Sequence, residues 1–551
     1  MQNPINFIGN VKLDFSVYNG KDYYSDGGIE NEIFLHVKAG NEENFLRSDN
    51  RFHVLYYLSP LRHFLLEWLP IGKNDSVLEI GCGCGALTGS LTQKGATIEA
   101  VELSPRRAKI CALRNRDREN LTIHVGNLND MTFDKKFDFV ILVGVLEYAE
   151  KFTHTKNPQI DFLKKCKSFL KPDGALVIAI ENRLGIEYFS GTAESHTGRL
   201  FDGILDYPQP FGVRTFSRLE LKNLLTSCGL VDQKFFYPYP DYKFPYVIHS
   251  DEMPPTASDF AHLGDHFYDV DRVELFPMRQ ALLSIINADL YQELANSFLI
   301  VASQTHENKR IFPLKVFANN YPRKPKYQLR TEIHRAASGL IVKKIARTPF
   351  AREHLKTMVE NCKIFSDIYG AEHVAQMKLV SDDTAEVEYI DGITLEDYIL
   401  QVLEEGGVNA FVNVLTFYFK NILRGSDDNQ DFSEDCIDFN LPNRQYQYDL
   451  NLHNVLIRNG DFVFFDYEFL LPNLPKKFIA WRAFHDICFK RKKFLERYGI
   501  NVENLVGTLE LSSDTLNEYN IQNLAIFHTF ADTYITKYLK KRLPIKELKL
   551  N

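Results

Sequence analysis

Residues 77 to 85 read Val77-Leu78-Glu79-Ile80-Gly81-Cys82-Gly83-Cys84-Gly85. The apolar residues at the start predict a buried strand over 76–80, and the glycines predict a tight turn into a helix over 86–94. Alternating glycines let backbone amides come close to a ligand at the carboxyl edge of a parallel sheet. The spacing is GxGxG with an acidic residue two positions before the first glycine, which differs from the GxGxxG of dinucleotide-binding folds.

Strand and helix patterns alternate on the C-terminal side of this loop. The strands are short and apolar, as expected for strands that are covered on both faces of a parallel sheet. This order predicts an α/β fold with a mostly parallel sheet. We expect strands over 97–103, 121–125, 137–143, 175–180, 231–237 and 297–303, and helices over 105–118, 158–170 and 217–228.

Composition narrows the class of protein. The chain has 551 residues, of which 45% are hydrophobic and 25% charged, with a formal net charge of −8. These values exclude a disordered or fibrous chain and give no basic domain for nucleic acid. The cysteines form no CxxC pair, and no apolar run reaches about 18 residues. Residues 1–11 lack a basic region followed by an apolar run, so we expect that they are not a signal peptide. We expect a cytoplasmic enzyme with no transmembrane segment; peripheral association with a membrane stays open.

Polar residues follow the next strands where a nucleoside would lie. Glu102 ends the second strand, where its carboxylate can hydrogen-bond both hydroxyls of a ribose. Asn127 follows the third strand and can contact an adenine edge, with Leu103 and Leu128 on either side of the ring. The alternatives are a domain that binds NAD and a glycine-rich turn without a ligand.

The same residues resemble the class I methyltransferases that depend on S-adenosylmethionine (SAM). The resemblance covers residues 70–185 and extends loosely to about 303. It implies SAM over the glycine loop with Glu79 near the methionine end, and a seven-stranded Rossmann-like sheet in the order 3-2-1-4-5-7-6 with one antiparallel strand. It also implies that a helical region over 1–70 covers the site. The matching positions, in order, are Glu79, Gly81, Gly83, Gly85, Glu102 and the Gly126-Asn127 step.

The methyl acceptor is expected beyond the fourth and fifth strands. Transfer to an acceptor that is already nucleophilic needs alignment more than acid–base chemistry. A histidine with a nearby arginine can hold an anionic acceptor such as a phosphate; a solvated loop explains the same residues equally well. The candidates are Glu147 and Tyr148 after the fourth strand, Asn182 and Arg183 after the fifth, and Glu194, His196 and Arg199 in the insertion that follows.

The C-terminal half carries a second pattern. Asp449 is followed after four residues by Asn454, and an apolar strand over 462–465 ends at Asp466. Phosphoryl transfer uses one carboxylate to orient the attacking hydroxyl, and an Asn and a second carboxylate to hold Mg²⁺. The pattern therefore predicts a phosphotransferase.

This half resembles the protein-kinase-like fold, more closely the aminoglycoside and choline phosphotransferases. The resemblance implies ATP and Mg²⁺ as cofactors, Asp449 as the catalytic base, and Asn454 and Asp466 as metal ligands. It also implies a hinge whose backbone from Glu388 to Ile390 meets adenine, a phosphate-binding lysine at Lys343 or, as second choice, Lys344, and Glu360 as the partner of that lysine. The chain lacks a glycine-rich phosphate loop and a DFG motif, so a non-catalytic binding domain is the alternative.

The predicted domain order is unusual. We expect a helical lid over 1–70, a methyltransferase domain over 71–303, a linker over 304–310, and a two-lobed α+β kinase-like domain over 311–551 divided at 392/393. This order resembles the bifunctional kinase/methyltransferases that cap polymannose O-antigen chains in bacteria. That resemblance implies a glycan or glycolipid acceptor and a polysaccharide-assembly enzyme as partner. A methyltransferase with a kinase-like binding domain and a non-enzymatic assembly factor are the alternatives.

Overall fold

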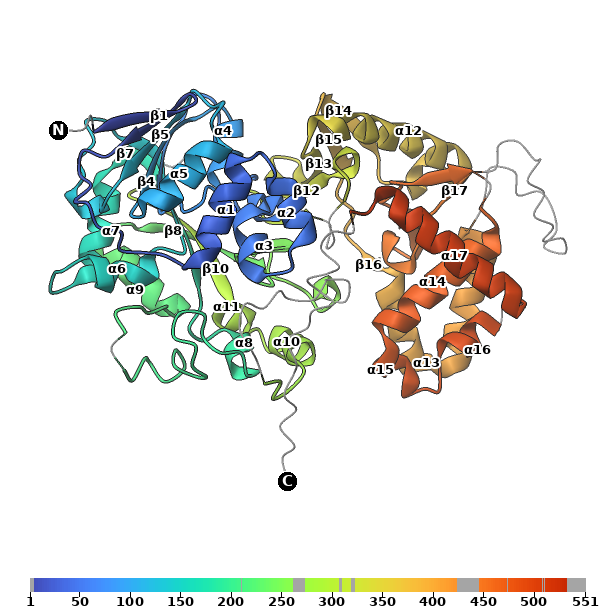
Figure 1. Ribbon diagram of the computed structural model, residues 1–551. Coiled ribbons are helices and arrows are strands. Elements are labelled where there is room, and N and C mark those ends of the chain that lie inside the picture. The colour runs from blue at the N-terminus through green and yellow to red at the C-terminus, as the bar shows by residue number, and fades with distance from the viewer. Residues whose placement is uncertain are drawn as a thin grey trace. The chain divides into compact units, whose positions relative to one another are not determined.

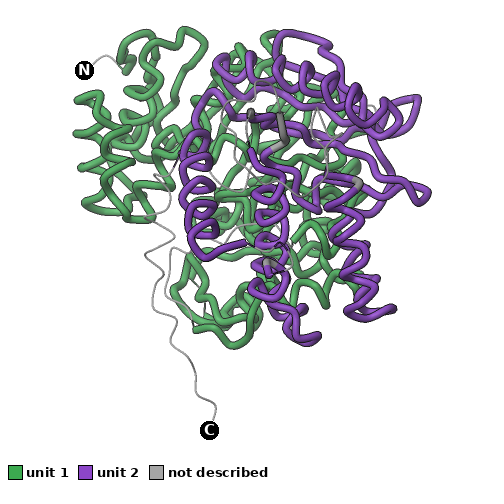
Figure 2. The backbone as a smooth tube through the Cα atoms, turned by 90° about the vertical axis from the view of Figure 1, so that its right-hand side faces the viewer, with its two compact units in different colours: residues 1–318, 534–551 green, residues 319–533 purple. Residues whose placement is uncertain are grey.

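The computed structural model describes residues 4–209, 211–260, 273–306, 310–318, 323–423, 445–472, 474–507, 509 and 511–532 (Figure 1). The described chain divides into two compact units, the first ending at Ala318 and the second spanning 319–533 (Figure 2). The buried apolar clusters of the first unit end at Ala318, whereas the cluster of the second runs from Leu329 to Ala531. Each unit therefore has its own hydrophobic core.

The first unit is built on a largely parallel sheet. Its central strands run in the order β5-β4-β3-β6-β7-β10-β8, and β10 is antiparallel to both of its neighbours. Counted along the chain, this is the predicted order 3-2-1-4-5-7-6, with the predicted antiparallel strand. The bounds are β3 Ser76–Ile80, β4 Thr97–Glu102, β5 Leu121–Val125, β6 Phe137–Val143, β7 Leu170–Glu181, β8 Asp232–Tyr239 and β10 Ser297–Ser303.

Further strands extend both edges of this sheet and correct two predictions. The hairpin of β1 (Ile5–Ile8) and β2 (Val11–Asp14) adds β2 in parallel to β5, so the region predicted as a helical lid begins as sheet. At the other edge, β9 (Val247–Ser250) pairs with β11 (Lys315–Ala318). Residues 311–318, which the sequence analysis placed in the kinase-like domain, thus belong to the first unit, and the boundary lies after the predicted linker. In β2 and β11, alternate side chains are buried in the core of the first unit: Val11 and Leu13 in β2, and Val316 and Ala318 in β11.

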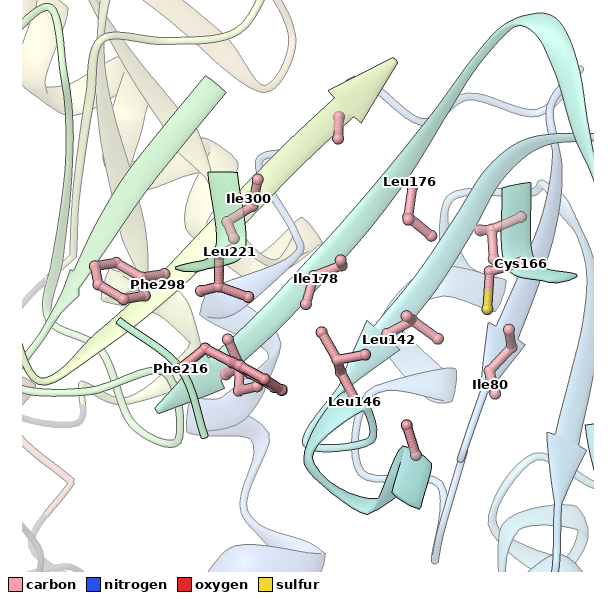
Figure 3. Close-up of a cluster of buried hydrophobic side chains, with 14 of the residues drawn as sticks. Ile80, Leu142, Leu146, Cys166, Leu176, Ile178, Phe216, Leu221, Phe298 and Ile300 are labelled. Carbon is pink, nitrogen blue, oxygen red and sulfur yellow. The ribbon is translucent and has the colours of Figure 1, made fainter. Parts of the chain in front are cut away.

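Helices cover the sheet and complete the core. Within the region predicted as a helical lid, α3 ends at Leu58 and a 3₁₀ turn begins at Pro60, because a proline cannot donate the helical hydrogen bond. Figure 3 shows side chains of β3, β6, β7 and β10 meeting those of α7, α9 and the segment before α9. The bounds are α1 Gly28–Lys38, α2 Glu42–Ser48, α3 Phe52–Leu58, a 3₁₀ turn Pro60–Leu65, α4 Thr88–Gln93, α5 Pro105–Arg114, α6 Ala149–Phe152, α7 Pro158–Ser168, α8 Ile186–Phe189, α9 Arg218–Ser227, α10 Met278–Asn287 and α11 Tyr291–Leu294.

The second unit combines an antiparallel sheet with a mainly helical part. Its first strands run in the order β12-β13-β15-β14, with the long helix α12 between β13 and β14 in the chain. No helix within the described residues has both the length and the apolar character needed to cross a membrane. The bounds are β12 Leu329–Ala336, β13 Gly339–Ala346, α12 Arg352–Tyr369, β14 Met377–Ser381, β15 Thr384–Glu388, β16 Ile393–Thr394, α13 Leu395–Phe417, β17 Gln445–Gln447, β18 Val455–Arg458, β19 Asp461–Phe464, β20 Leu470–Pro472, α14 Lys476–Lys490, α15 Lys492–Glu496, α16 Val502–Gly507 and α17 Ser513–Phe530.

Candidate functional site

A cavity of about 390 Å³ lies at the carboxyl ends of β3, β4 and β6 in the first unit. This is the edge at which ligands bind in open α/β sheets. Gly85 is the one predicted SAM-binding residue that does not line it; a side chain there would meet Cys111 Sγ at 2.9 Å, so Gly85 allows the close packing of α5. The predicted cofactor residues that line the cavity are Glu79, Gly81, Gly83, Glu102, Leu103, Asn127 and Leu128.

The first two glycines of the loop play different parts. Both have positive φ, +76° at Gly81 and +55° at Gly83, which favours glycine. A Cβ at Gly81 would lie 2.6 Å from Val145 Cγ2, so this glycine is needed for packing. A Cβ at Gly83 would have no atom within 4 Å, apart from its chain neighbours. Gly83 therefore leaves an open cradle at the cavity wall that a side chain would fill.

Glu102 joins the end of β4 to the glycine loop. Its Oε2 accepts a hydrogen bond from the Gly83 amide at 2.8 Å, and its Oε1 accepts one from the Ser104 amide at 2.9 Å. Burial raises the pKa of this carboxyl, and the charge of Arg107 opposes that rise. The carboxylate borders the cavity, so ribose hydroxyls would share its oxygens with these two amides.

Two buried charged groups without full hydrogen bonding face the same cavity. Oε2 of Glu79 accepts no hydrogen bond from the described residues, and burial raises the pKa of this carboxyl to about 7. Nε of Arg62 likewise has no hydrogen-bond partner among the residues that the structure describes, while its guanidinium stacks over the Tyr56 ring at 3.7 Å. A carboxylate and a guanidinium complement the ammonium and carboxylate of an α-amino acid. These residues therefore fit the methionine end of SAM.

Asn127 has a more structural environment than the sequence suggested. Its Oδ1 accepts a hydrogen bond from the Asn129 amide at 3.0 Å, and its Nδ2 donates to the Phe152 carbonyl at 3.1 Å. The side chain thus fixes the turn after β5 against α6. Leu103 and Leu128 both border the cavity and remain candidates for contacts with a flat ring.

A second polar cluster lines the cavity, and it includes predicted acceptor residues. Nε2 of His196 lies 3.4 Å from Glu181 Oε2 and 4.0 Å from Glu147 Oε1. Lys243 Nζ lies 3.2 Å from Glu181 Oε1, and the Tyr148 hydroxyl lies 3.2 Å from His196 Nδ1. We call Glu147, Tyr148, Glu181, His196 and Lys243 the acceptor cluster.

The charges of the acceptor cluster are strongly coupled. Burial raises the pKa of Glu147 to about 8, and the neighbouring charge of Glu181 adds to the rise. Burial also opposes ionisation of Glu181, but Lys243 and His196 outweigh it and hold its pKa well below the usual range. Burial alone would lower the pKa of His196, yet the charge of Glu181 raises it to about 9. One carboxylate is therefore firmly ionised, and the other titrates near neutral pH.

The structure does not bring the predicted arginines to this cavity. Arg199 is exposed and lies over the Phe211 ring at 4.6 Å, and it does not line the cavity, whereas His196 does. Arg183 contacts Glu220 at 2.7 Å and so supports the start of α9. The prediction that His196 and Arg199 together hold an anion is corrected accordingly.

Two predicted residues have structural contacts, and three residues of the cavity were not predicted. Glu194 accepts a hydrogen bond from Tyr207, and the Asn182 amide donates to the backbone before β10, so both are structural. Sequence reasoning missed Arg62, Glu181 and Lys243. Lys243 follows an aromatic and proline-rich stretch, and that unusual composition could have indicated a functional segment. The only comparable feature near Arg62 is Pro60, two positions before it.

The segment that leads into the first turn of α1 lines this cavity through Tyr24 and Asp26. Arg107 of α5 contacts Asp26 and Glu30 at 2.6 Å each, and its guanidinium lies over the Tyr24 ring at 4.4 Å. The hydroxyl groups of Tyr24 and Tyr148 are 3.2 Å apart. We call residues 22–30 the N-terminal strap.

In the second unit, the predicted metal and base residues lie close together. Lys344 Nζ is 3.1 Å from Asp466 Oδ1, and Asn454 Nδ2 donates to the Asp449 carbonyl at 2.6 Å. Arg482 lies 2.9 Å from Asp449 Oδ1. Burial raises the pKa of Asp466; Lys344 counteracts this, and the charge of Asp449 adds to it.

The lysine prediction is corrected from the first choice to the second. Alternation along β13 turns Lys344 toward Asp466, whereas Lys343 stands opposite Glu332 and Glu386 in the flanking strands. Which set of alternate side chains along β13 faces inward depends on how the strand packs, and the sequence does not show this.

The predicted partner of the lysine is also corrected. Glu360 is exposed on α12, so it does not reach the buried site where Lys344 meets Asp466. The buried Glu468 instead contacts His354 of the same helix at 2.8 Å, and also Arg323. His354 and Glu360 lie six positions apart on α12, so they face different sides of the helix.

At the predicted hinge, the structure leaves the adenine contact untested. The Glu388 amide donates to the Gln376 carbonyl at 2.9 Å, and its side chain is exposed near Arg458. Ile390 is buried in the apolar cluster of the second unit.

Comparisons with known proteins concern the first unit. Residues 78–178 match the family model described as "Methyltransferase domain". The chain is 29% identical to the ubiquinone biosynthesis O-methyltransferase of Haemophilus ducreyi over 24% of this chain and 56% of that protein. It is 31% identical to the demethylmenaquinone methyltransferase of Tropheryma whipplei over 21% of this chain and 46% of that protein.

The chain spans about half the length of these curated relatives. Among solved structures, it is similar to a phosphoethanolamine N-methyltransferase 2 of Haemonchus contortus in complex with SAM. That similarity has a TM-score of 0.30 and 13% identity, and it covers 53% of this chain and 62% of the other.

Proposed function

We propose that this protein transfers the methyl group of SAM to an acceptor in the cavity of its first unit, because its N-terminal part contains a class I SAM-dependent methyltransferase domain. The observation that carries the proposal is the pair of buried, incompletely hydrogen-bonded groups on Glu79 and Arg62, beside the open cradle at Gly83. An α-amino acid ligand would satisfy both groups at once.

Each part of the cavity then has a task. Glu79 and Arg62 hold the amino-acid end of the cofactor, Glu102 accepts hydrogen bonds from its ribose, and Leu103 and Leu128 contact its base. SAM supplies an electrophilic methyl group. The acceptor cluster holds the acceptor in line with that group, and this alignment provides much of the rate.

Binding of S-adenosylhomocysteine (SAH) tests the cofactor assignment. Titration calorimetry on the full chain should show binding that weakens about 10- to 100-fold in Arg62→Gln, since a buried hydrogen bond to a charge is worth about 1.5–3 kcal/mol. Arg47→Gln is the matched control, because Arg47 is an exposed arginine of α2 paired with Glu43. A wild-type chain that does not bind SAH would refute the proposal.

We propose a second activity, ATP-dependent phosphoryl transfer, for the second unit. The proposal is supported by the cluster of Lys344, Asp449, Asn454 and Asp466, the set of groups that this chemistry uses. Asn454 and Asp466 would hold Mg²⁺, Lys344 would meet a phosphate of ATP, and Asp449 would orient the attacking hydroxyl. The alternative is a unit that binds nucleotide or acceptor without transfer.

Two neighbouring lysines offer a sharp test of this second proposal. Magnesium-dependent release of ADP should fall at least about 100-fold in Lys344→Ala and in Asp449→Ala, because each removes a charge at the transferring group. Lys343→Ala is the matched control on the opposite face of β13 and should stay within about threefold of wild type. ATP binding without any ADP release by the wild-type chain would favour the binding-only alternative.

The order of the two units extends the proposal to the substrate. We propose a glycan or glycolipid end as the molecule that is phosphorylated and methylated, with a polysaccharide-assembly enzyme as partner. The support is the resemblance in domain order and motifs. Incubation of mannose oligosaccharides with ATP and SAM, followed by mass spectrometry, should detect added phosphate and methyl groups; their absence would remove this part of the proposal.

A further inference from the structure

We propose that the methyl acceptor presents a neutral hydroxyl group, and that Glu147 takes its proton during transfer. This inference rests on the methyltransferase function proposed above and specifies the acceptor of that site. It concerns the acceptor cluster at the cavity wall and assigns Glu147 as a catalytic residue.

The hydrogen bonding of Glu147 is the first argument. The residue is 1% exposed and lines the cavity, yet neither carboxylate oxygen accepts a hydrogen bond from another described residue. Leaving a buried acceptor unsatisfied costs about 1–3 kcal/mol, so such groups call for a partner. An acceptor hydroxyl that donates to Glu147 supplies this partner.

The distribution of charge argues against an anionic acceptor. The two cations of the acceptor cluster, His196 and Lys243, both lie against the ionised Glu181, at 3.4 Å and 3.2 Å. The Tyr242 hydroxyl donates to the same carboxylate at 3.3 Å. A phosphate placed here would meet cations that already have a counterion and would lie beside the acidic Glu147. Arg199, the other predicted anion ligand, is exposed and does not line the cavity.

The same charges argue against a cationic acceptor. An ammonium group at Glu147 would lie near His196, whose Nε2 is 4.0 Å from Glu147 Oε1 and whose raised pKa keeps it protonated. Like charges at such a distance repel each other strongly in a buried site. A neutral group that donates a hydrogen bond avoids both penalties.

The reaction balances without a further reactant. The acceptor oxygen forms a bond to the methyl carbon, the carbon–sulfur bond breaks, and sulfur keeps the electron pair. The hydroxyl proton passes to the carboxylate of Glu147. A general base works best when its pKa lies near the working pH, and burial together with Glu181 raises the pKa of Glu147 to about 8, against the opposing charges of His196 and Lys243. Titratable groups outside the cluster also face it: the Tyr242 hydroxyl donates to Glu181, the Tyr24 hydroxyl lies 3.2 Å from that of Tyr148, and the charge of Glu194 interacts with His196.

The test uses the full chain with radiolabelled SAM and three named acceptor probes: mannotriose, mannose 6-phosphate and phosphoethanolamine. We expect methylation of a mannotriose hydroxyl, identified by mass spectrometry, and none of phosphate oxygen or amine nitrogen. In Glu147→Gln, kcat should fall at least about 100-fold, while the Kd for SAH stays within about twofold. Glu150→Gln is the matched control, because Glu150 is exposed on the adjacent α6.

The outcomes separate this inference from the proposed function. Absence of SAH binding would refute the methyltransferase itself. With SAH bound, three results would overturn the hydroxyl proposal: methylation of phosphate or amine, no methylation of mannotriose, or full activity in Glu147→Gln. Loss of activity in EDTA, restored by Mg²⁺, would also overturn it, because Glu147, Glu181 and His196 would then act as metal ligands.

Discussion

Glu79 is the residue whose titration should control cofactor binding. Burial raises its pKa to about 7 from an ordinary value of 4.5, so the proton stays on until higher pH. Below that pH, pairing with an ammonium group must first remove the proton, at a cost of about 1.4 kcal/mol per pH unit. The Kd for SAH should therefore fall up to about tenfold per unit as pH rises from about 5 to 7, and level off above about pH 8.

Calorimetry in a series of buffers measures this profile. Glu79→Gln is isosteric and cannot titrate, so its affinity should be weaker and nearly constant over the same range. Glu147, with a pKa of about 8, titrates at the upper end of this range, and the variant separates its effect from that of Glu79. A wild-type profile as flat as that of Glu79→Gln would contradict the assignment.

Two glycines of one loop should respond differently to the same substitution. Gly83→Ala costs about 1 kcal/mol for its positive φ and places a methyl group in the open cradle, so SAH affinity should fall at least about tenfold. Gly81→Ala has the same backbone cost and also places Cβ 2.6 Å from Val145 Cγ2, so stability should fall by about 3 kcal/mol. Urea unfolding and SAH titration distinguish them; equal losses of stability would be the contrary result.

At the scale of elements, the N-terminal strap is held to α5 by a buried ion pair. The Arg107 side chain is 9% exposed and the Glu30 side chain 0%. Arg107→Ala leaves Glu30 buried and without its closest cation, which typically costs about 3–5 kcal/mol. We expect a matching loss in thermal unfolding and weaker SAH binding, because Tyr24 and Asp26 line the cavity.

Arg106 offers the control for this element. It lies next to Arg107 on α5, but its side chain is 37% exposed and 3.7 Å from Glu30. Arg106→Ala should change stability by less than about 1 kcal/mol, because exposed ion pairs contribute little. If both variants were equally stable, the strap would not depend on the buried pair.

At the scale of the whole molecule, the two units should fold independently of each other. Because their apolar cores are separate, residues 1–318 should fold by themselves and bind SAH with a Kd within about threefold of the full chain. In calorimetry of the full chain, SAH should raise the unfolding temperature of one transition and leave the other unchanged. A fragment that is unfolded by circular dichroism would contradict the independence of the first unit.

Periodic segments of the sequence predicted elements well. The strands over 121–125, 137–143 and 297–303 have the predicted bounds, and the order of the central strands is the predicted one. Predictions were less accurate where local pattern carries no spatial information. The hairpin at the N-terminus was missed, because its burial depends on a parallel strand more than a hundred residues away.

The sequence by itself determined the alternation of strands and helices, the glycine loop, and the residues Glu79 and Glu102 at its sides. Strand ends in a parallel sheet converge on one edge, so their order in the chain is enough to place them. Only the tertiary structure decided which side chains of the irregular segments face the cavity. It selected His196 over Arg199, and it brought Arg62, Glu181 and Lys243 to the cavity. In the second unit, the packing of β13 selected Lys344 over Lys343. The direction of a loop side chain, and the pKa that burial gives it, depend on segments distant in sequence.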